Sequence, residues 1–175
     1  MKVDRKEKTL LTYIGPLIVV EDIAVSRRFY EELLGQKVKY DFGVNVSFEK
    51  DFAIHLKSHF QALLGDAPGF QATAKAHNGE LVFETDEIEL PFSRLQLAGA
   101  EFIHAVQEQP WGQRCMRLYD PDGHVLEIGE TMDGAVRRMH SQGMTLDRIT
   151  EKSGMPREFV ERTIQEYSAS DQGRI

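Results

Sequence analysis

The stretch "LIVVEDIAVSRRFYEELLGQKVKY", residues 17–40, decides the fold because its pattern occurs twice in the chain. It begins as an apolar strand, followed by an acidic residue and an isoleucine, Asp22-Ile23. A helix of about ten residues comes next, with apolar residues near the i, i+4 spacing of one buried face. Gly35 then suits a helix end, where a left-handed residue is commonly needed. A further strand follows the glycine.

The second copy is "LVFETDEIELPFSRLQLAGAEFIHA", residues 81–105. Its acidic residue and isoleucine are Glu87-Ile88, and its glycine is Gly99. The offset is 65 residues before the helix (22 to 87) and 64 after it (35 to 99), so the second copy has lost one residue within its helix.

Three strand-like runs, separated by turn residues, end each copy. They are expected near 37–42, 45–49 and 52–57 in the first copy, and near 101–106, 113–119 and 124–129 in the second. The pattern is therefore βαβββ, twice. We predict an α+β fold in which two such modules, about 12–60 and 77–131, form curved mixed sheets within one domain, 12–131.

The two ends of the chain differ from this pattern. Residues 1–11 are charged and read as a flexible tail without a signal peptide. Residues 132–175 read as a helical extension that resembles a helix-turn-helix, with Thr145 as a helix cap. This extension carries as many acidic as basic residues. Because DNA binding needs an excess of positive charge, we expect a packing role for these helices and no nucleic-acid partner.

Composition narrows the class of protein. A chain of 175 residues has room for about one domain, and a net charge of −7 argues against binding to nucleic acid or anionic membranes. No apolar run reaches the roughly 18 residues that a membrane span needs. The single cysteine, Cys115, excludes an internal disulfide and fits a reducing, cytoplasmic location. Cys115 itself reads as a small core residue.

Strand alternation places three polar residues on what we expect to be the concave faces of the sheets. Glu127 stands between the aliphatic residues Leu126 and Ile128, so it points to the opposite face. His55 in "FAIHLK" and Glu80 in "ELVFET" alternate with apolar neighbours in the same way. Each of the three side chains is therefore a candidate for the functional site.

The paired modules and three motifs, "VVEDIAVSRRFYEELLG", "ELVFETDEIE" and "PWGQRCMRLYDPDGHVLEIGE", resemble the vicinal oxygen chelate superfamily over about residues 13–130. Its members include glyoxalase I, bleomycin-resistance proteins and extradiol dioxygenases. The resemblance implies metal ligands from the first and last strands of each module. These positions are His55, Glu80 and Glu127, while the fourth falls on Gly15, which has no side chain to offer.

The resemblance implies a glyoxalase-like metal-dependent lyase or isomerase acting on a small oxygenated metabolite. Glu127 would abstract a proton, Glu80 would be the second carboxylate, and His55 would be a plain ligand. This set of nitrogen and oxygen donors suits Zn²⁺, Ni²⁺, Mn²⁺, Fe²⁺ or Mg²⁺. The alternative is a metal-free protein that sequesters a ligand, of the bleomycin-resistance type, which Gly15 favours. A homodimer is expected from the same resemblance.

A substrate pocket is predicted from the motif around strand 113–119. Arg114 and Met116 share one face of this strand, and Arg117 lies on the other. An arginine that reaches the pocket would pair with a substrate carboxylate through two parallel hydrogen bonds. Trp111 would form a wall of the pocket. We therefore predict that Trp111, Arg114 and Met116 line it.

Overall fold

The computed structural model describes residues 13–65, 69 and 71–172. The chain divides into two compact units, Met1–Ala72 and Thr73–Ile175, each of which is described by itself. The N-terminal tail predicted over residues 1–11 lies outside the described residues.

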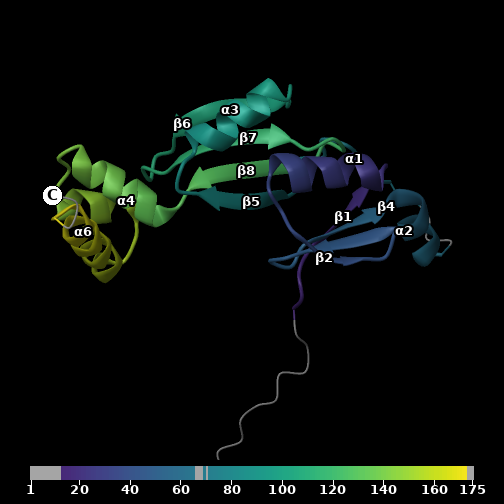
Figure 1. Cartoon of the computed structure of the whole chain (residues 1–175), viewed down its shortest axis with the longest axis horizontal. Helices are drawn as coiled ribbons and strands as arrows, with labels where there is room; N and C mark the ends of the chain where they lie inside the picture. The colour runs from purple at the N-terminus through teal and green to yellow at the C-terminus, as the bar shows by residue number, and fades with distance from the viewer. Residues whose placement is uncertain (1–12, 66–68, 70, 173–175) are drawn as a thin grey trace, which may run out of the picture. The chain divides into compact units, whose positions relative to one another are not determined.

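The first unit contains a four-stranded sheet in the order β1-β4-β3-β2 (Figure 1). Strands β1 and β4 are parallel, and the other neighbours are antiparallel. The strands are β1 (Leu17–Val20), β2 (Val38–Asp41), β3 (Asn45–Phe48) and β4 (Ala53–Leu56). The helices are α1 (Ile23–Arg27), which continues as a π-helical segment η1 (Arg28–Leu33), and α2 (Lys57–Leu63).

Local chemistry explains where the first helix begins and what it packs against. The Asp22 carboxylate accepts hydrogen bonds from the backbone N–H groups of Ala24 (2.7 Å) and Val25 (3.1 Å) and so caps the helix. The fully buried Tyr30 ring lies 5.7 Å from the ring of Phe48 and 5.2 Å from that of Phe52. This aromatic cluster forms much of the first unit's core.

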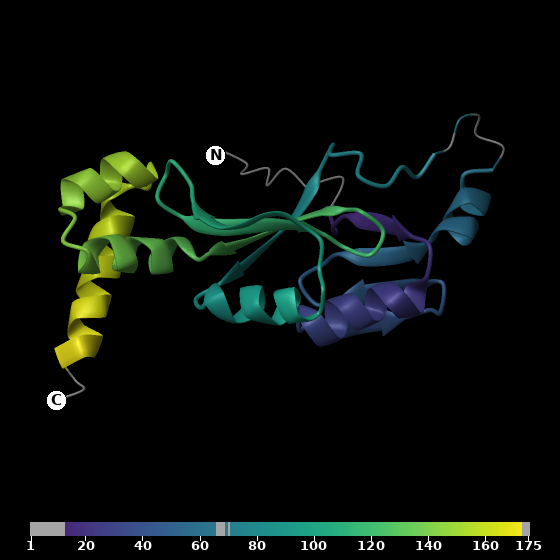
Figure 2. The same cartoon turned by 90° about the horizontal axis from the view of Figure 1, so that it is seen from above.

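The second unit repeats the same topology, with strand order β5-β8-β7-β6 and β5 parallel to β8. Its elements are β5 (Glu80–Thr85), α3 (Glu89–Leu97), β6 (Phe102–Glu108), β7 (Arg114–Tyr119) and β8 (Val125–Glu130). Helix α3 lies on one side of the sheet (Figure 2). The predicted α+β fold of two βαβββ modules is confirmed.

The two faces of the second sheet differ in what covers them. Phe92 of α3 contacts Phe102 edge to face at 5.3 Å, and Phe102 pairs with Leu118 on the neighbouring strand. Leu118 in turn pairs with Leu126, and both are fully buried. The helix therefore covers the apolar face that the alternation predicts. The opposite face, hereafter the open face, carries Glu80, Glu127 and Arg117.

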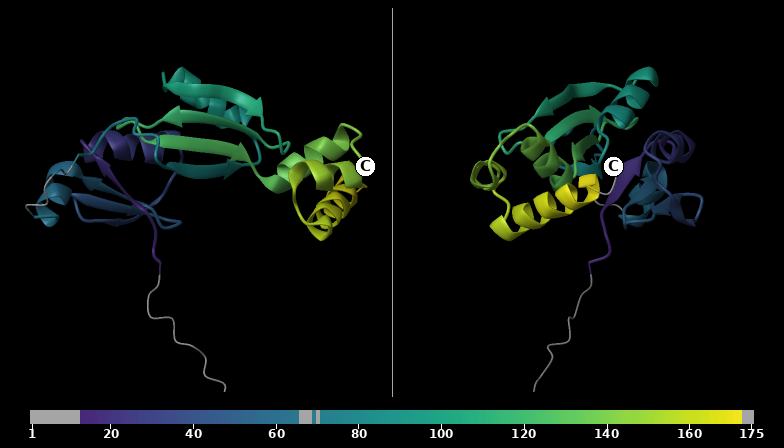
Figure 3. Two further views of the ribbon diagram at one scale, coloured as in Figure 1. Left: turned by 180° about the vertical axis from the view of Figure 1, so that it is seen from behind. Right: turned by 60° about the vertical axis from the view of Figure 1, so that its left-hand side comes forward.

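Three further helices follow β8: α4 (Met132–Ser141), α5 (Leu146–Ser153) and α6 (Arg157–Gln172). They pack on one another (Figure 3) around a core of Val136, Met139, Ile149 and Val160. Thr145 caps α5 by accepting from the backbone N–H of Arg148, as predicted. Within the described ranges, no helix combines the length and the apolar character needed to cross a membrane.

Candidate functional site

The open face of the second sheet brings two of the predicted site residues together. Glu127 on β8 lies opposite Arg117 on β7 and opposite Val82 on β5. Glu80 is two residues before Val82, so its side chain points to the same face. The Glu127 side chain is only 10% exposed, whereas those of Arg117 and Glu80 are 25% and 35% exposed.

Arg117 contacts both glutamates through its guanidinium group. Its Nε donates to Glu80 Oε2 (2.9 Å) and its Nη2 to Glu80 Oε1 (3.5 Å). The same Nη2 donates to Glu127 Oε2 in a short hydrogen bond. The hydrogen bond with Glu80, more than the charge of Glu127, raises the pKa of Arg117 above the ordinary arginine value. The contact with Glu80 therefore favours the charged form of Arg117.

In this arrangement the guanidinium of Arg117 lies where a metal ion bound by both carboxylates would lie. Two carboxylates that face one another need a cation or a proton, and here the guanidinium is that cation. A divalent ion that bridged the two carboxylates would compete with Arg117 for Glu80 Oε2 and Glu127 Oε2. Across residues 13–65, 69 and 71–172, no three His, Cys, Asp or Glu side chains are grouped so as to hold a metal ion.

His55, the third predicted ligand, belongs to the first unit, where it is 6% exposed. Its Nδ1 lies 3.1 Å from Asn45 Nδ2, and its Nε2 lies 2.7 Å from Nδ1 of His59. Burial, together with the charge of His59, lowers the pKa of His55. Both ring nitrogens thus have partners within the first unit. Its role as a metal ligand stays a prediction.

Gly15, at the fourth predicted ligand position, is required by the backbone. Its φ is +152°, and a Cβ placed there would lie 1.6 Å from the carbonyl oxygen of Asp51. No side chain fits between two backbones at that distance. The missing fourth ligand therefore has a steric cause within the first unit.

The predicted pocket residues lie elsewhere in the second unit. Met116 is fully buried and pairs with Ile128 on the face opposite Glu127. The Arg114 guanidinium donates to Glu130 Oε1 (2.7 Å) and to Glu89 Oε1 (2.9 Å). Trp111 is 38% exposed and donates its indole N–H to Gln113 Oε1 at 2.9 Å. The arginine that reaches the glutamates is Arg117, which alternation had placed on the other face without selecting it.

A cavity of about 410 Å³ opens beside Glu80. Near it the imidazole of His77 stacks on the Tyr119 ring, with 2.5 Å between His77 Nε2 and the tyrosine oxygen. The Nζ of Lys75 lies 4.6 Å from the centroid of the same ring. The cavity is lined by His77, Asn78, Gly79, Glu80, Ile103 and Val125.

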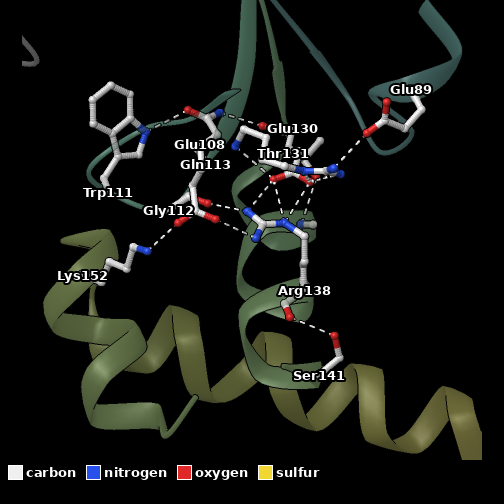
Figure 4. Close-up of polar contacts among 12 residues, drawn as sticks. Glu89, Glu108, Trp111, Gly112, Gln113, Glu130, Thr131, Arg138, Ser141 and Lys152 are labelled. Carbon is white, nitrogen blue, oxygen red and sulfur yellow. Dashed lines mark hydrogen bonds and ion pairs between the residues drawn. The ribbon is translucent and has the colours of Figure 1, made fainter. Parts of the chain in front are cut away.

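A second charged cluster joins the sheet to the C-terminal helices (Figure 4). The Glu130 side chain, 6% exposed, accepts from Arg114 Nε (2.7 Å) and from Arg138 Nη2 (3.0 Å). Arg138 also donates to Glu108 (3.0 Å), which accepts from Lys152 (2.5 Å). These contacts link strands β6, β7 and β8 to helices α4 and α5.

Comparison with known proteins is consistent with this architecture. Residues 13–133 match the family described as "Glyoxalase-like domain". The uncharacterised protein YwbC of Bacillus subtilis is 30% identical over 116 residues, which cover 63% of this chain and 90% of YwbC.

Among solved structures, a protein of unknown function from Agrobacterium tumefaciens is 35% identical, with a TM-score of 0.62. The match covers 69% of this chain and 94% of that one. A lactoylglutathione lyase from Agrobacterium tumefaciens shares the fold at 18% identity and a TM-score of 0.54, over 70% of this chain and 96% of the lyase.

Proposed function

The chain belongs to the glyoxalase-like domain family of the vicinal oxygen chelate superfamily, and we propose that it binds a small organic molecule beside Glu80 without a metal ion. It would then work as a metal-free binding protein, as bleomycin-resistance members do. The observation that supports this proposal is the guanidinium of Arg117, which engages the carboxylates of both Glu80 and Glu127. A homodimer and a cytoplasmic location stay predictions.

The residues around the cavity suggest the chemistry of the ligand. Ile103 and Val125 offer apolar surface, whereas Glu80 offers carboxylate oxygens that are partly exposed. The single positive charge of Arg117 balances only one of the two glutamates, so these three side chains together keep a negative charge. Such a site favours a ligand with an apolar body and a hydrogen-bond donor, above all an amine.

Calorimetric titration tests this proposal with three probes of one carbon skeleton: a primary amine, an alcohol and a carboxylate. We expect the amine to bind best and Glu80→Gln to weaken it about tenfold or more, because the ion pair is lost. Glu84→Gln is the matched control, since Glu84 lies on the same strand and face but does not line the cavity. Preferred binding of the carboxylate, or equal weakening by both substitutions, would contradict the proposal.

A metal-dependent lyase or isomerase is the second candidate. The observation in its favour is that Glu80 and Glu127 reach the same guanidinium, so their oxygens converge. Elemental analysis of the protein and of Glu127→Ala, each dialysed against a panel of divalent ions, separates the two functions. Near-stoichiometric metal that is lost in the variant supports the second candidate. No retained metal supports the first.

A further inference from the structure

We propose that Arg117 is a built-in counter-cation that keeps divalent metal ions off the Glu80–Glu127 pair. The inference rests on the proposed metal-free function and assigns the residue that enforces it. Arg117 is here a positioning and specificity-determining residue: it holds two carboxylates and excludes a competing ligand. From the sequence alone, only Gly15 explained why a metal ion would lack its full set of ligands.

The first step of the argument is register. Arg117 and Glu127 are direct partners on the antiparallel strands β7 and β8, so their side chains leave the same face as neighbours. Glu80 approaches from β5, on the other side of β8. Two nitrogens of one rigid, planar group, Nε and Nη2, thus make three hydrogen bonds to glutamates on two strands that are distant in sequence.

The second step is burial. With a side chain 10% exposed, Glu127 has lost most of its contact with water and depends on a charged partner. Removing one partner of such a pair leaves an uncompensated charge, which is strongly unfavourable. An arginine cannot be neutralised in this environment, so the partner is permanent. A metal ion that bridged the two carboxylates would compete with the guanidinium for Glu80 Oε2 and Glu127 Oε2.

The third step is the consequence for metal affinity. The free energy needed to displace Arg117 is subtracted from the binding free energy of any divalent ion at these oxygens. When the guanidinium is absent, Glu80 and Glu127 face one another with like charges and need a new cation. Removal of Arg117 is therefore expected to create metal affinity that the natural sequence suppresses.

The experiment is a calorimetric titration with Mn²⁺ alone, repeated with Zn²⁺, on the full chain and on Arg117→Leu. We expect the variant to bind at least tenfold more tightly than the natural protein. The double variant Arg117→Leu, Glu127→Gln should lose this gain. Arg117→Lys keeps the charge but not the planar fork, so its gain in metal affinity should be smaller. This variant replaces Arg117→Leu in the titration if circular dichroism shows that the leucine variant does not fold.

Arg27→Leu is the matched control. Arg27 also bridges two carboxylates, with Nε 2.5 Å from Glu31 and Nη1 2.6 Å from Asp41, but those side chains are 32% and 42% exposed. Water solvates them once the arginine is gone, so no gain in metal affinity is expected.

The inference is overturned if the natural protein binds either ion as tightly as the folded Arg117 variants do. It is also overturned if the gain survives Glu127→Gln, or if Arg27→Leu gains equally. Failure of the amine titration would refute the proposed ligand while leaving these metal affinities unaffected. The two proposals can therefore fail separately.

Discussion

Replacement of Glu130 by glutamine tests how strongly the charged cluster fastens the C-terminal helices to the second sheet. The Glu130 side chain is 6% exposed and accepts from Arg138 and from both the backbone and the side chain of Arg114. Loss of one partner of a buried ion pair costs about 3–5 kcal/mol. Because the two arginine side chains are 32% and 17% exposed, water screens part of this loss. We therefore expect Glu130→Gln to lower the free energy of unfolding by about 3 kcal/mol.

Urea denaturation followed by tryptophan fluorescence measures this change. Trp111 is the chain's single tryptophan, and its indole bonds Gln113, which donates to the backbone carbonyl of Glu130 at 2.6 Å. Glu89→Gln is the control, because Glu89 bonds the same Arg114 at 2.9 Å but is 66% exposed. An exposed pair contributes about 0–1 kcal/mol. If Glu130→Gln costs no more than Glu89→Gln, the cluster does not hold the helices as argued.

The stability lost in Glu130→Gln should depend on pH. Burial raises the pKa of Glu130, but hydrogen bonds from Arg138 and Arg114 outweigh it, so the pKa is lowered. In an unfolded chain the pKa of glutamate is about 4.3. The stabilisation is therefore present above that pH and is lost as the pH falls through the lower, folded pKa. The difference in unfolding free energy between the natural protein and Glu130→Gln should shrink as the pH falls below about 4.

Three further predictions concern single residues. Gly15→Ala should lower the free energy of unfolding of the first unit by about 3 kcal/mol, because the alanine Cβ would overlap the Asp51 carbonyl. Urea denaturation followed by circular dichroism measures this free energy. Burial lowers the pKa of His124, but the Asp120 carboxylate, 2.9 Å away, outweighs burial and raises it. This contact should therefore stabilise the fold below about pH 6.5, and the stabilisation should be lost as the pH rises through the folded pKa. Proton NMR titration of the His124 ring would refute this if its pKa were not raised. Met116→Ala should cost about 2–5 kcal/mol in urea denaturation and leave amine binding unchanged, because Met116 is core on the covered face.

The fold could be predicted because its information is local and repeated. Asp22 caps a helix, Gly35 follows it with a φ of +66°, and each strand shows its alternation in the sequence itself. Alternation also placed Glu80 and Glu127 on one face, where the structure has both in contact with Arg117.

The pocket residues could not be predicted in the same way. Strand alternation predicts that Arg114 and Arg117 face opposite sides of one strand, but it does not predict which side a helix covers. That choice depends on helix α3, whose Phe92 packs against the face of Leu118. Met116 consequently lies in the core.

The sequence by itself determined the two βαβββ modules, the helical extension and the face that carries the two glutamates. These features follow from hydrophobic periodicity and capping, which act between residues close in the chain. Only the tertiary structure decided that Arg117 balances Glu80 and Glu127, and that Gly15 is fixed by the Asp51 carbonyl. Both depend on register between segments distant in sequence, where a shift of one residue would turn every side chain to the other face.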